Sequence, residues 1–260
     1  MGKNQVIALV VAIVAVIIFY LGCDNLSQSQ QRINETRKGS LVATDIQNLL
    51  NKAKDEMSET NRGEISALES IVRNSAPDTL AMLSNLEKLS ASWFQFGHAE
   101  IAGHYAKEIA NIKQDAGSWE IAGTTFVLCL QKSDDPKIRT FCSTNAVTAF
   151  ENAIAEDPEN VSHRINLALC YVEEPQKDNP MRGILMLREL SENYPDNPSV
   201  RYQLGRLAVM TGQFEKAIER LESAYTLSPD DKRIVCLLAD TYQKVGNSLK
   251  SEEFAKKCTN

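Results

Sequence analysis

The arrangement of small and large apolar residues repeats at a nearly fixed interval along this chain. Leu204 returns 34 residues later as Leu238, and Gly212 returns at the same distance as Gly246. A stretch of the same character opens at Leu167, 37 residues before Leu204, with the extra residues in its connection. Each unit contains two amphipathic helical segments joined by a short turn. A period near ~34 residues with this content predicts an array of helical hairpins that stack on one another.

The residues of these units resemble the tetratricopeptide-repeat family, whose pattern is W-x2-L-G-x2-Y…A-x3-F…P. One unit matches that pattern through Trp119, Gly123, Phe126, Ala146, Phe150, Ala153 and Pro158. A weaker copy upstream consists of Leu89, Trp93, Gly97, Ala102 and Ala106. The resemblance implies an all-α, TPR-like solenoid of helical hairpins, with about five units over residues 79–260.

The connections of the units carry further signals. Residues 127–145 exceed the family's spacing by about eleven residues, so a longer connection is expected there. Asp135-Pro136 and Asn179-Pro180 each resemble a helix N-cap followed by proline at the first helical position. A helix is therefore expected to begin at each of these two dipeptides.

The N-terminus carries a separate signal, an uninterrupted apolar run from Val6 to Leu21. As a helix this run is ~24 Å long, which approaches the ~30 Å hydrocarbon core of a bilayer. A helix at the surface of a soluble core would show a polar face, and this run shows none. Residues 1–23 are therefore predicted to be a membrane anchor or signal, with residues 6–21 as a transmembrane helix.

Two alternatives to an uncleaved anchor stay open. A cleaved secretory signal would need a small-x-small site after the run, and none follows. A bacterial lipoprotein signal would place Gly22 before a lipidated Cys23, with Tyr20 where that motif prefers leucine. Basic residues flank the run on both sides and give no clear orientation. Because a short tail precedes a large domain, we expect a single-pass protein of the bacterial inner membrane with its domain in the periplasm.

The next segments link the anchor to the solenoid. Residues 24–39 are polar and poor in large apolar side chains, which predicts a flexible tether. Residues 40–78 contain two stretches of helical apolar spacing and are expected to form a helical hairpin that caps the solenoid. A coiled-coil segment is the alternative, but these stretches are too short for the three or four heptads that it would need.

Charge and cysteine content restrict the partners. The net charge of −6 at pH 7 disfavours binding to nucleic acid and attraction to anionic lipid. The cysteines are Cys23, Cys129, Cys142, Cys170, Cys236 and Cys258. No C-x2-C pair occurs, so no zinc site is expected, and the odd number beyond Cys23 favours buried thiols. Cys129 paired with Cys142 is the alternative, and Cys258 is expected to be a small core residue.

No motif for chemistry accompanies the repeats. His98 and His104 are six residues apart, which is not the i, i+4 spacing of a metal-binding pair. The sequence contains no recognisable phosphate-binding loop and no nucleophile–base pair. We therefore expect no cofactor, no metal and no enzymatic activity. An enzyme with an unrecognised site is the least favoured alternative.

The resemblance implies that the first helices of the units line a groove for a protein or an extended peptide segment. Spacing selects these candidates for the groove: Asn166, Leu169, Tyr202, Gln203, Arg206, Arg233 and Asp240. Asn166 stands where peptide-binding relatives use asparagine to hold a ligand backbone, while Tyr202 and Arg206 share one helix face. The Lys/Asn/Arg set of the carboxylate-clamp subgroup is not reproduced.

The expected function is therefore a membrane-tethered scaffold or adaptor that binds a protein partner in a cell-envelope assembly. A lipoprotein accessory to secretion or outer-membrane assembly is the alternative, because unrelated envelope systems share this architecture.

Overall fold

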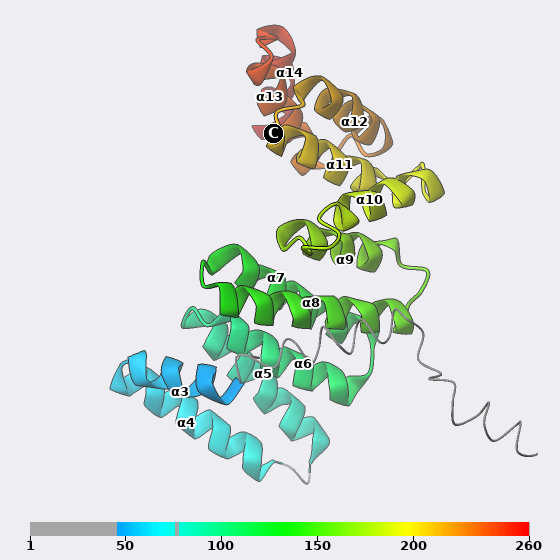
Figure 1. Cartoon of the computed structure of the whole chain (residues 1–260). Coiled ribbons are helices and arrows are strands. Elements are labelled where there is room, and N and C mark those ends of the chain that lie inside the picture. Colours follow the sequence, from blue (N-terminus) through cyan, green and yellow to red (C-terminus); the bar gives the residue numbers. More distant parts are fainter. Residues whose placement is uncertain (1–45, 76–77, 260) are drawn as a thin grey trace, which may run out of the picture. The chain divides into compact units, whose positions relative to one another are not determined.

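The computed structural model describes residues 46–75 and 78–259. Within these residues the chain forms twelve α-helices and no strand, apart from an isolated bridge between Gln176 and Asn179. Successive helices are joined by short connections and reverse direction (Figure 1). The helices are α3 (Ile46–Glu56), α4 (Glu59–Asn74), α5 (Thr79–Gln95), α6 (Ala99–Lys113), α7 (Ala116–Lys132), α8 (Pro136–Glu156), α9 (Val161–Glu173), α10 (Arg182–Asn193), α11 (Pro198–Met210), α12 (Phe214–Leu227), α13 (Lys232–Lys244) and α14 (Ser248–Thr259).

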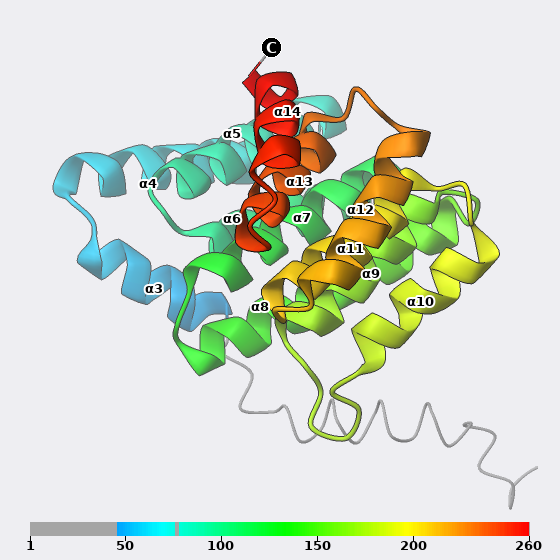
Figure 2. The ribbon, with the colours of Figure 1, turned by 90° about the horizontal axis from the view of Figure 1, so that it is seen from above.

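From α5 onward the helices pack as five pairs: α5/α6, α7/α8, α9/α10, α11/α12 and α13/α14. The second helix of each pair also packs on the first helix of the next, so most contacts join neighbours in the sequence. Figure 2 shows α11 and α12 side by side in this way. The all-α hairpin array expected from the period is therefore confirmed for the described residues. In such an array each pair is stabilised by its neighbours.

The first helix of every one of these pairs begins at an aspartate or asparagine whose side chain accepts a hydrogen bond from the first turn. These N-caps are Asp78, Asp115, Asn160, Asn197 and Asp231. Asp135-Pro136 begins α8, as predicted. The prediction for Asn179-Pro180 is wrong, because α10 begins at Arg182 with Met181 as its N-cap. Asn179 is used in a turn instead, where its N–H donates to the carbonyl of Gln176.

Glycines with positive φ mark equivalent turns between paired helices. Their φ angles of +92°, +73° and +77° favour glycine, and they belong to Gly97, Gly212 and Gly246. In each turn the residue after the glycine donates its N–H to the carbonyl of the residue five positions before that donor, which is Trp93, Ala208 or Tyr242. The first pair therefore follows the register of the later pairs. Gly97 is a turn residue equivalent to Gly212 and Gly246, and Trp93 stands at the place of Ala208 and Tyr242.

The longer connection expected over residues 127–145 is mostly helix, so that expectation is wrong. α7 has 17 residues and α8 has 21, whereas α11 and α12 have 13 and 14. Residues 133–135 alone separate α7 from α8. The additional residues therefore lengthen the two helices of this pair instead of forming a loop.

The N-terminal helices α3 and α4 lie against the first pair. α3 packs on α6 and α4 packs on α5, while an ion pair of 2.7 Å between Lys54 and Glu69 joins α3 to α4. Their role as a cap stays a prediction. The predicted anchor at 1–23, the tether at 24–39 and the alternative lipid site at Cys23 lie outside the described residues. Among the helices of the described ranges, none combines the length and apolar character needed to cross a bilayer.

Candidate functional site

An open groove of about 450 Å³ lies among α5, α6 and α7. α5 and α7 form its two sides, and buried alanines of α6 form its floor. Most of its surface is apolar. The lining residues are Glu87, Ser90, Ala91, Phe94 and Gln95 of α5, Ala102, Ala106, Ile109 and Lys113 of α6, and Ser118, Ile121, Thr125 and Leu128 of α7.

The groove is open because α6 carries a small residue where α8 and α12 carry a large one. Nine residues after the turn glycine, α12 has Leu221 and α6 has Ala106. Leu221 fills the space over Gly205, where an added Cβ would lie 2.7 Å from the leucine side chain. Phe150 covers Gly123 in the same way in α7/α8. In α5/α6 only a methyl group stands at this position, so the space beside it is not filled.

Two large apolar side chains stand on the sides of the groove. Phe94 of α5 is 40% exposed and Ile121 of α7 is 64% exposed. Near Phe94, the Lys132 ammonium lies 5.0 Å from the centroid of the aromatic ring. Glu87 and Lys113 line the groove as well and form an ion pair of 3.2 Å. Exposed apolar groups gathered in a concave site are typical of a surface that binds another apolar surface.

The start of the α7 side is fixed by its N-cap. Ser118, which lines the groove, donates both its N–H and its hydroxyl to the carboxylate of Asp115, each at 2.8 Å. These hydrogen bonds favour the charged carboxylate, so they lower the pKa of Asp115 below its ordinary value. The cap therefore orders the first turn of α7 in its deprotonated form.

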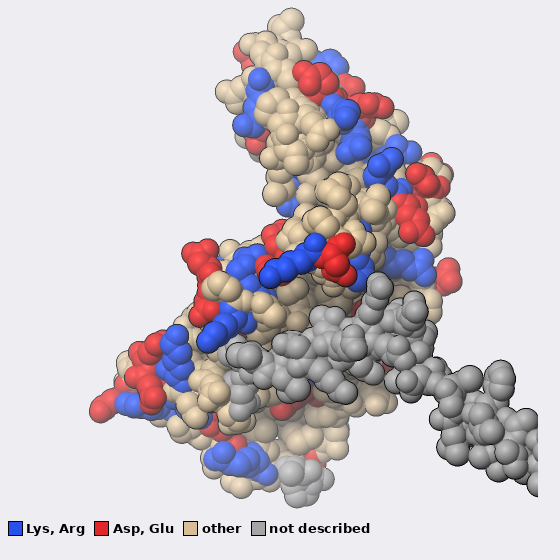
Figure 3. Space-filling view, in the orientation of Figure 1, with Lys and Arg blue, Asp and Glu red and all other residues tan. Residues whose placement is uncertain are grey.

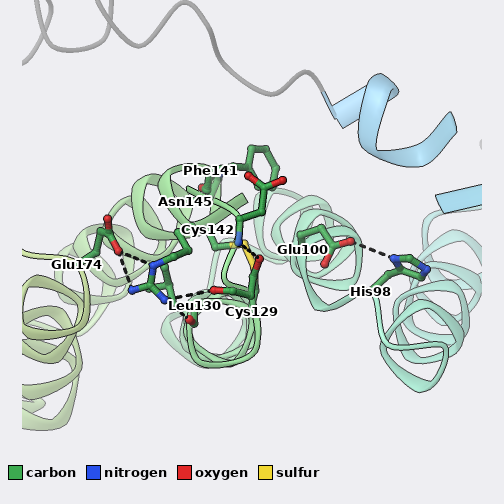
Figure 4. The surroundings of a disulfide bond; sticks show 11 residues. His98, Glu100, Cys129, Leu130, Phe141, Cys142, Asn145 and Glu174 are labelled. Carbon is green, nitrogen blue, oxygen red and sulfur yellow. Dashed lines mark hydrogen bonds and ion pairs between the residues drawn. A yellow bond between two sulfur atoms is a disulfide. The ribbon is translucent and has the colours of Figure 1, made fainter. Parts of the chain in front are cut away.

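The other end of α7 is tied to its neighbours. A disulfide joins Cys129 of α7 to Cys142 of α8 (Figure 4). Arg139 of α8 donates to the carbonyl of Leu130 at 2.7 Å and pairs with the carboxylate of Glu174, directly after α9, also at 2.7 Å. The residues that lengthen this pair thus bind the last turns of α7 to α8 and α9.

The expectation of buried thiols is wrong for four cysteines. Besides the bond between Cys129 and Cys142, Cys236 of α13 is bonded to Cys258 of α14. Cys258 is therefore not a free small core residue; it faces Cys236 because α14 runs back along α13. Cys170 is the free cysteine of the described residues, and burial raises the pKa of its thiol to about 12.

The seven residues predicted from spacing lie outside this groove, since none of them lines it. Asn166 of α9 donates to Glu120 of α7 at 3.5 Å. Tyr202 of α11 lies 5.4 Å from the guanidinium of Arg233 of α13, measured to the ring centroid. The structure thus brings together side chains of successive first helices, α7 with α9 and α11 with α13.

The remaining predicted residues are placed by contacts within α11, by core packing, or at the surface. Gln203 accepts a hydrogen bond from Arg206 at 2.9 Å, and Arg206 also lies 3.8 Å from the sulfur of Met210. Leu169 is partly buried against a core cluster, and Asp240 is exposed. A binding role for these residues stays a prediction.

The histidines singled out in the sequence pair with nearby glutamates. His98 lies 3.1 Å from Glu100, and His104 lies 3.2 Å from Glu108. Across residues 46–75 and 78–259, no group of three or more His, Cys, Asp or Glu side chains could hold a metal ion.

Stacked helix pairs with an open groove define an all-α protein built from helical-hairpin repeats. The model of the family described as tetratricopeptide repeat matches residues 198–241, so this segment of the chain carries that repeat. The matched segment contains α11, α12 and most of α13.

Several solved structures are similar to this chain. A crystal structure of MamA is 15% identical with a TM-score of 0.42, covering 66% of this chain and 92% of that one. MamA from Desulfovibrio magneticus RS-1 is 18% identical with a TM-score of 0.42, covering 68% and 93%. MamA AMB-1 is 21% identical with a TM-score of 0.37, covering 68% and 90%. At these TM-scores the similarities carry no argument about function. The comparison with curated proteins found no significant match.

Proposed function

We propose that this protein is a membrane-tethered scaffold that holds another protein of a bacterial cell-envelope assembly in the groove formed by α5, α6 and α7. The observation that carries the proposal is the apolar space beside Ala106, which Leu221 and Phe150 fill in other pairs. Fully burying an exposed side chain of this size contributes about 1.5–3 kcal/mol, and covering Phe94 and Ile121, which are 40% and 64% exposed, supplies the corresponding fraction of it. The groove therefore offers enough apolar surface to anchor a partner.

The composition of the groove favours binding over catalysis. Its lining residues include no histidine and no cysteine, and its carboxylate, Glu87, is paired with Lys113. On the face drawn in Figure 3, basic and acidic side chains are interspersed. A mixed surface of this kind supports a protein partner rather than a nucleic acid, which needs a basic patch.

Attachment and location form the second part of the proposal. The apolar run from Val6 to Leu21 supports a membrane anchor. The two disulfides support an oxidising compartment, where such bonds persist. We assign the domain to the periplasmic side of the inner membrane. Mass spectrometry of the N-terminus separates an uncleaved anchor, which retains Met1 or Gly2, from the alternative of an accessory lipoprotein, which carries lipid on Cys23.

The binding function is tested by purifying the full chain from crosslinked native membranes as wild type, Ile121→Asp and Leu249→Asp. Ile121 lines the groove, whereas Leu249 is 85% exposed on α14 and lies outside it. We expect the wild type and Leu249→Asp to retain the same stoichiometric partner. Ile121→Asp should reduce that partner at least ~tenfold, since a charge in an apolar contact costs more than ~1.4 kcal/mol. Equal retention by all three chains would contradict the proposal.

A further inference from the structure

We infer that the groove takes an amphipathic helix of the partner. Its aliphatic anchors would lie at i, i+3 or i+4, and i+7, with an acidic residue at the end near Lys132. This inference rests on the proposed function, because the occupant is the segment by which the partner is held. Three independent features of the groove lead to it: its polar groups, its length and its charge.

The first feature is that the hydroxyl donors of the groove are already used within the chain. Ser90 donates to the carbonyl of Ala102 at 2.9 Å, and Thr125 donates to the carbonyl of Ile121 at 2.8 Å. Ser118 donates to its N-cap, as described above. An extended segment pressed into this groove would leave its own backbone carbonyls without these donors.

An unpaired backbone group in a covered site costs about 1–3 kcal/mol. A helix avoids this cost, because its backbone N–H and C=O groups bond within the helix itself. The described residues also present no sheet edge that could pair with an added strand. A helical occupant is therefore favoured over an extended one.

The second feature is length. From Ser118 to Leu128 the lining residues of α7 span about 15 Å. Three anchors at i, i+4 and i+7 of a partner helix span about 11 Å, so they fit within this distance. On α7 the lining side chains recur every three or four residues, and such ridges accept the side chains of another helix.

The third feature is an unpaired cation. The Lys132 ammonium lies over the ring of Phe94, and no carboxylate lies within ion-pair distance of it among the described residues. Lys113, the other basic residue at the groove, is already paired with Glu87. A partner carboxylate beside Lys132 would therefore be attracted more strongly than one beside Lys113. This difference would orient the helix in the groove.

The test selects ligands on the full chain held in lipid nanodiscs. One displayed library is a stable helical hairpin with one randomised face, and the other is a linear randomised segment flanked by prolines to keep it extended. Binders are then measured against wild type and Ile121→Asp. We expect ligands that weaken at least ~tenfold with Ile121→Asp to come from the helical library and to carry apolar residues at the spacing stated above.

The outcomes separate the two proposals. Ligands that depend on Ile121 but bind as extended segments would overturn the helical occupant and leave the binding function intact. Recovery of no Ile121-dependent ligand from either library would overturn both.

The charge is tested separately. Lys132→Glu should weaken an acid-bearing ligand about three- to tenfold, and replacing the ligand's acid with glutamine should abolish that sensitivity. Lys177→Glu, in the exposed connection after α9, is the matched control. Equal affinity for the Lys132→Glu and Lys177→Glu chains would overturn the proposed orientation.

Discussion

The pairs α5/α6 and α11/α12 turn at equivalent glycines, yet one leaves a groove and the other is closed. In α11/α12 the large residue Leu221 lies against Gly205, and both are consumed by packing. In α5/α6 the corresponding residues are Ala106 and Ser90, and both line open space. The comparison shows that in a pair which matches the repeat pattern, the large pattern residue fills the core and leaves no open space. The α5/α6 pair lacks that large residue and keeps surface that a partner can cover.

The largest expected effect on stability comes from removing the side chain that closes the α11/α12 pair. Leu221→Ala removes a fully buried side chain from α12, so we expect a loss of about 2–5 kcal/mol in the free energy of unfolding. Chemical denaturation measures this loss. Leu249→Ala, on an exposed site, is the control and should change stability by less than about 0.5 kcal/mol. A loss of similar size in both variants would mean that Leu221 does not close its pair.

The two disulfides should contribute similarly to the stability of the fold but differ in their effect on ligand binding. Their cysteines are 13 and 22 residues apart, so losing either bond should cost about 3 kcal/mol by chain entropy. The double change Cys129→Ser with Cys142→Ser should also weaken the groove ligand, because it frees the last turns of α7. Cys236→Ser with Cys258→Ser should not. Calorimetric titration after correction for the folded fraction measures the difference. Equal ligand loss in both double variants would show that the α7 bond has no special connection to the groove.

The N-caps of α7 and α11 give a smaller effect that depends on pH. Asp115→Ala and Asn197→Ala should each cost about 1 kcal/mol at pH 7. The folded pKa of Asp115 is lowered, so its stabilisation is present above the ordinary aspartate pKa and is lost as pH falls through the folded value. The cost of Asp115→Ala should therefore shrink in acid, while that of Asn197→Ala stays constant. Denaturation midpoints at neutral and acidic pH measure both, and parallel behaviour of the two variants would contradict a role for the Asp115 charge.

The smallest change in stability is expected on α11. Tyr202→Ala with Arg206→Ala should lower the free energy of unfolding by less than about 1 kcal/mol, since both side chains are only partly buried. Partner capture should still weaken if the partner reaches beyond the groove, as the spacing predicts. Melting temperature and co-purified partner are measured together. Reduced stability with unchanged capture per folded molecule would mean that these side chains only support the fold.

The period in the sequence was enough to predict the hairpin array, and pattern residues such as Ala146 and Phe150 do lie buried. It did not distinguish glycines that form turns from glycines at close helix contacts. Gly97 stands among the pattern residues of a weaker copy, and its positive φ makes it a turn residue. The bond between Cys236 and Cys258 was missed because a partner 22 residues away is brought close only by the return of α14 along α13.

The candidate groove was predictable in part. Ala102 and Ala106 give A-x3-A where the family has A-x3-F, and this departure was visible in the sequence. Whether the missing volume stays open depends on where α7 places Ile121 relative to α5, which is a tertiary property. Spacing instead favoured Tyr202 and Arg206, because they lie on the best-matched pair.

The most direct measurement is the affinity of the Ile121-dependent ligand for Ala106→Leu, which gives α6 the residue that α12 has at Leu221. We expect affinity to fall at least ~tenfold, with a change in unfolding free energy of no more than about 1–3 kcal/mol. Ala91→Leu, at an exposed lining position of α5, should give the same loss without touching the core. Ala255→Leu, at an exposed position of α14 outside the groove, should leave affinity unchanged. Wild-type affinity in both Ala106→Leu and Ala91→Leu would contradict the claim that this groove holds the partner.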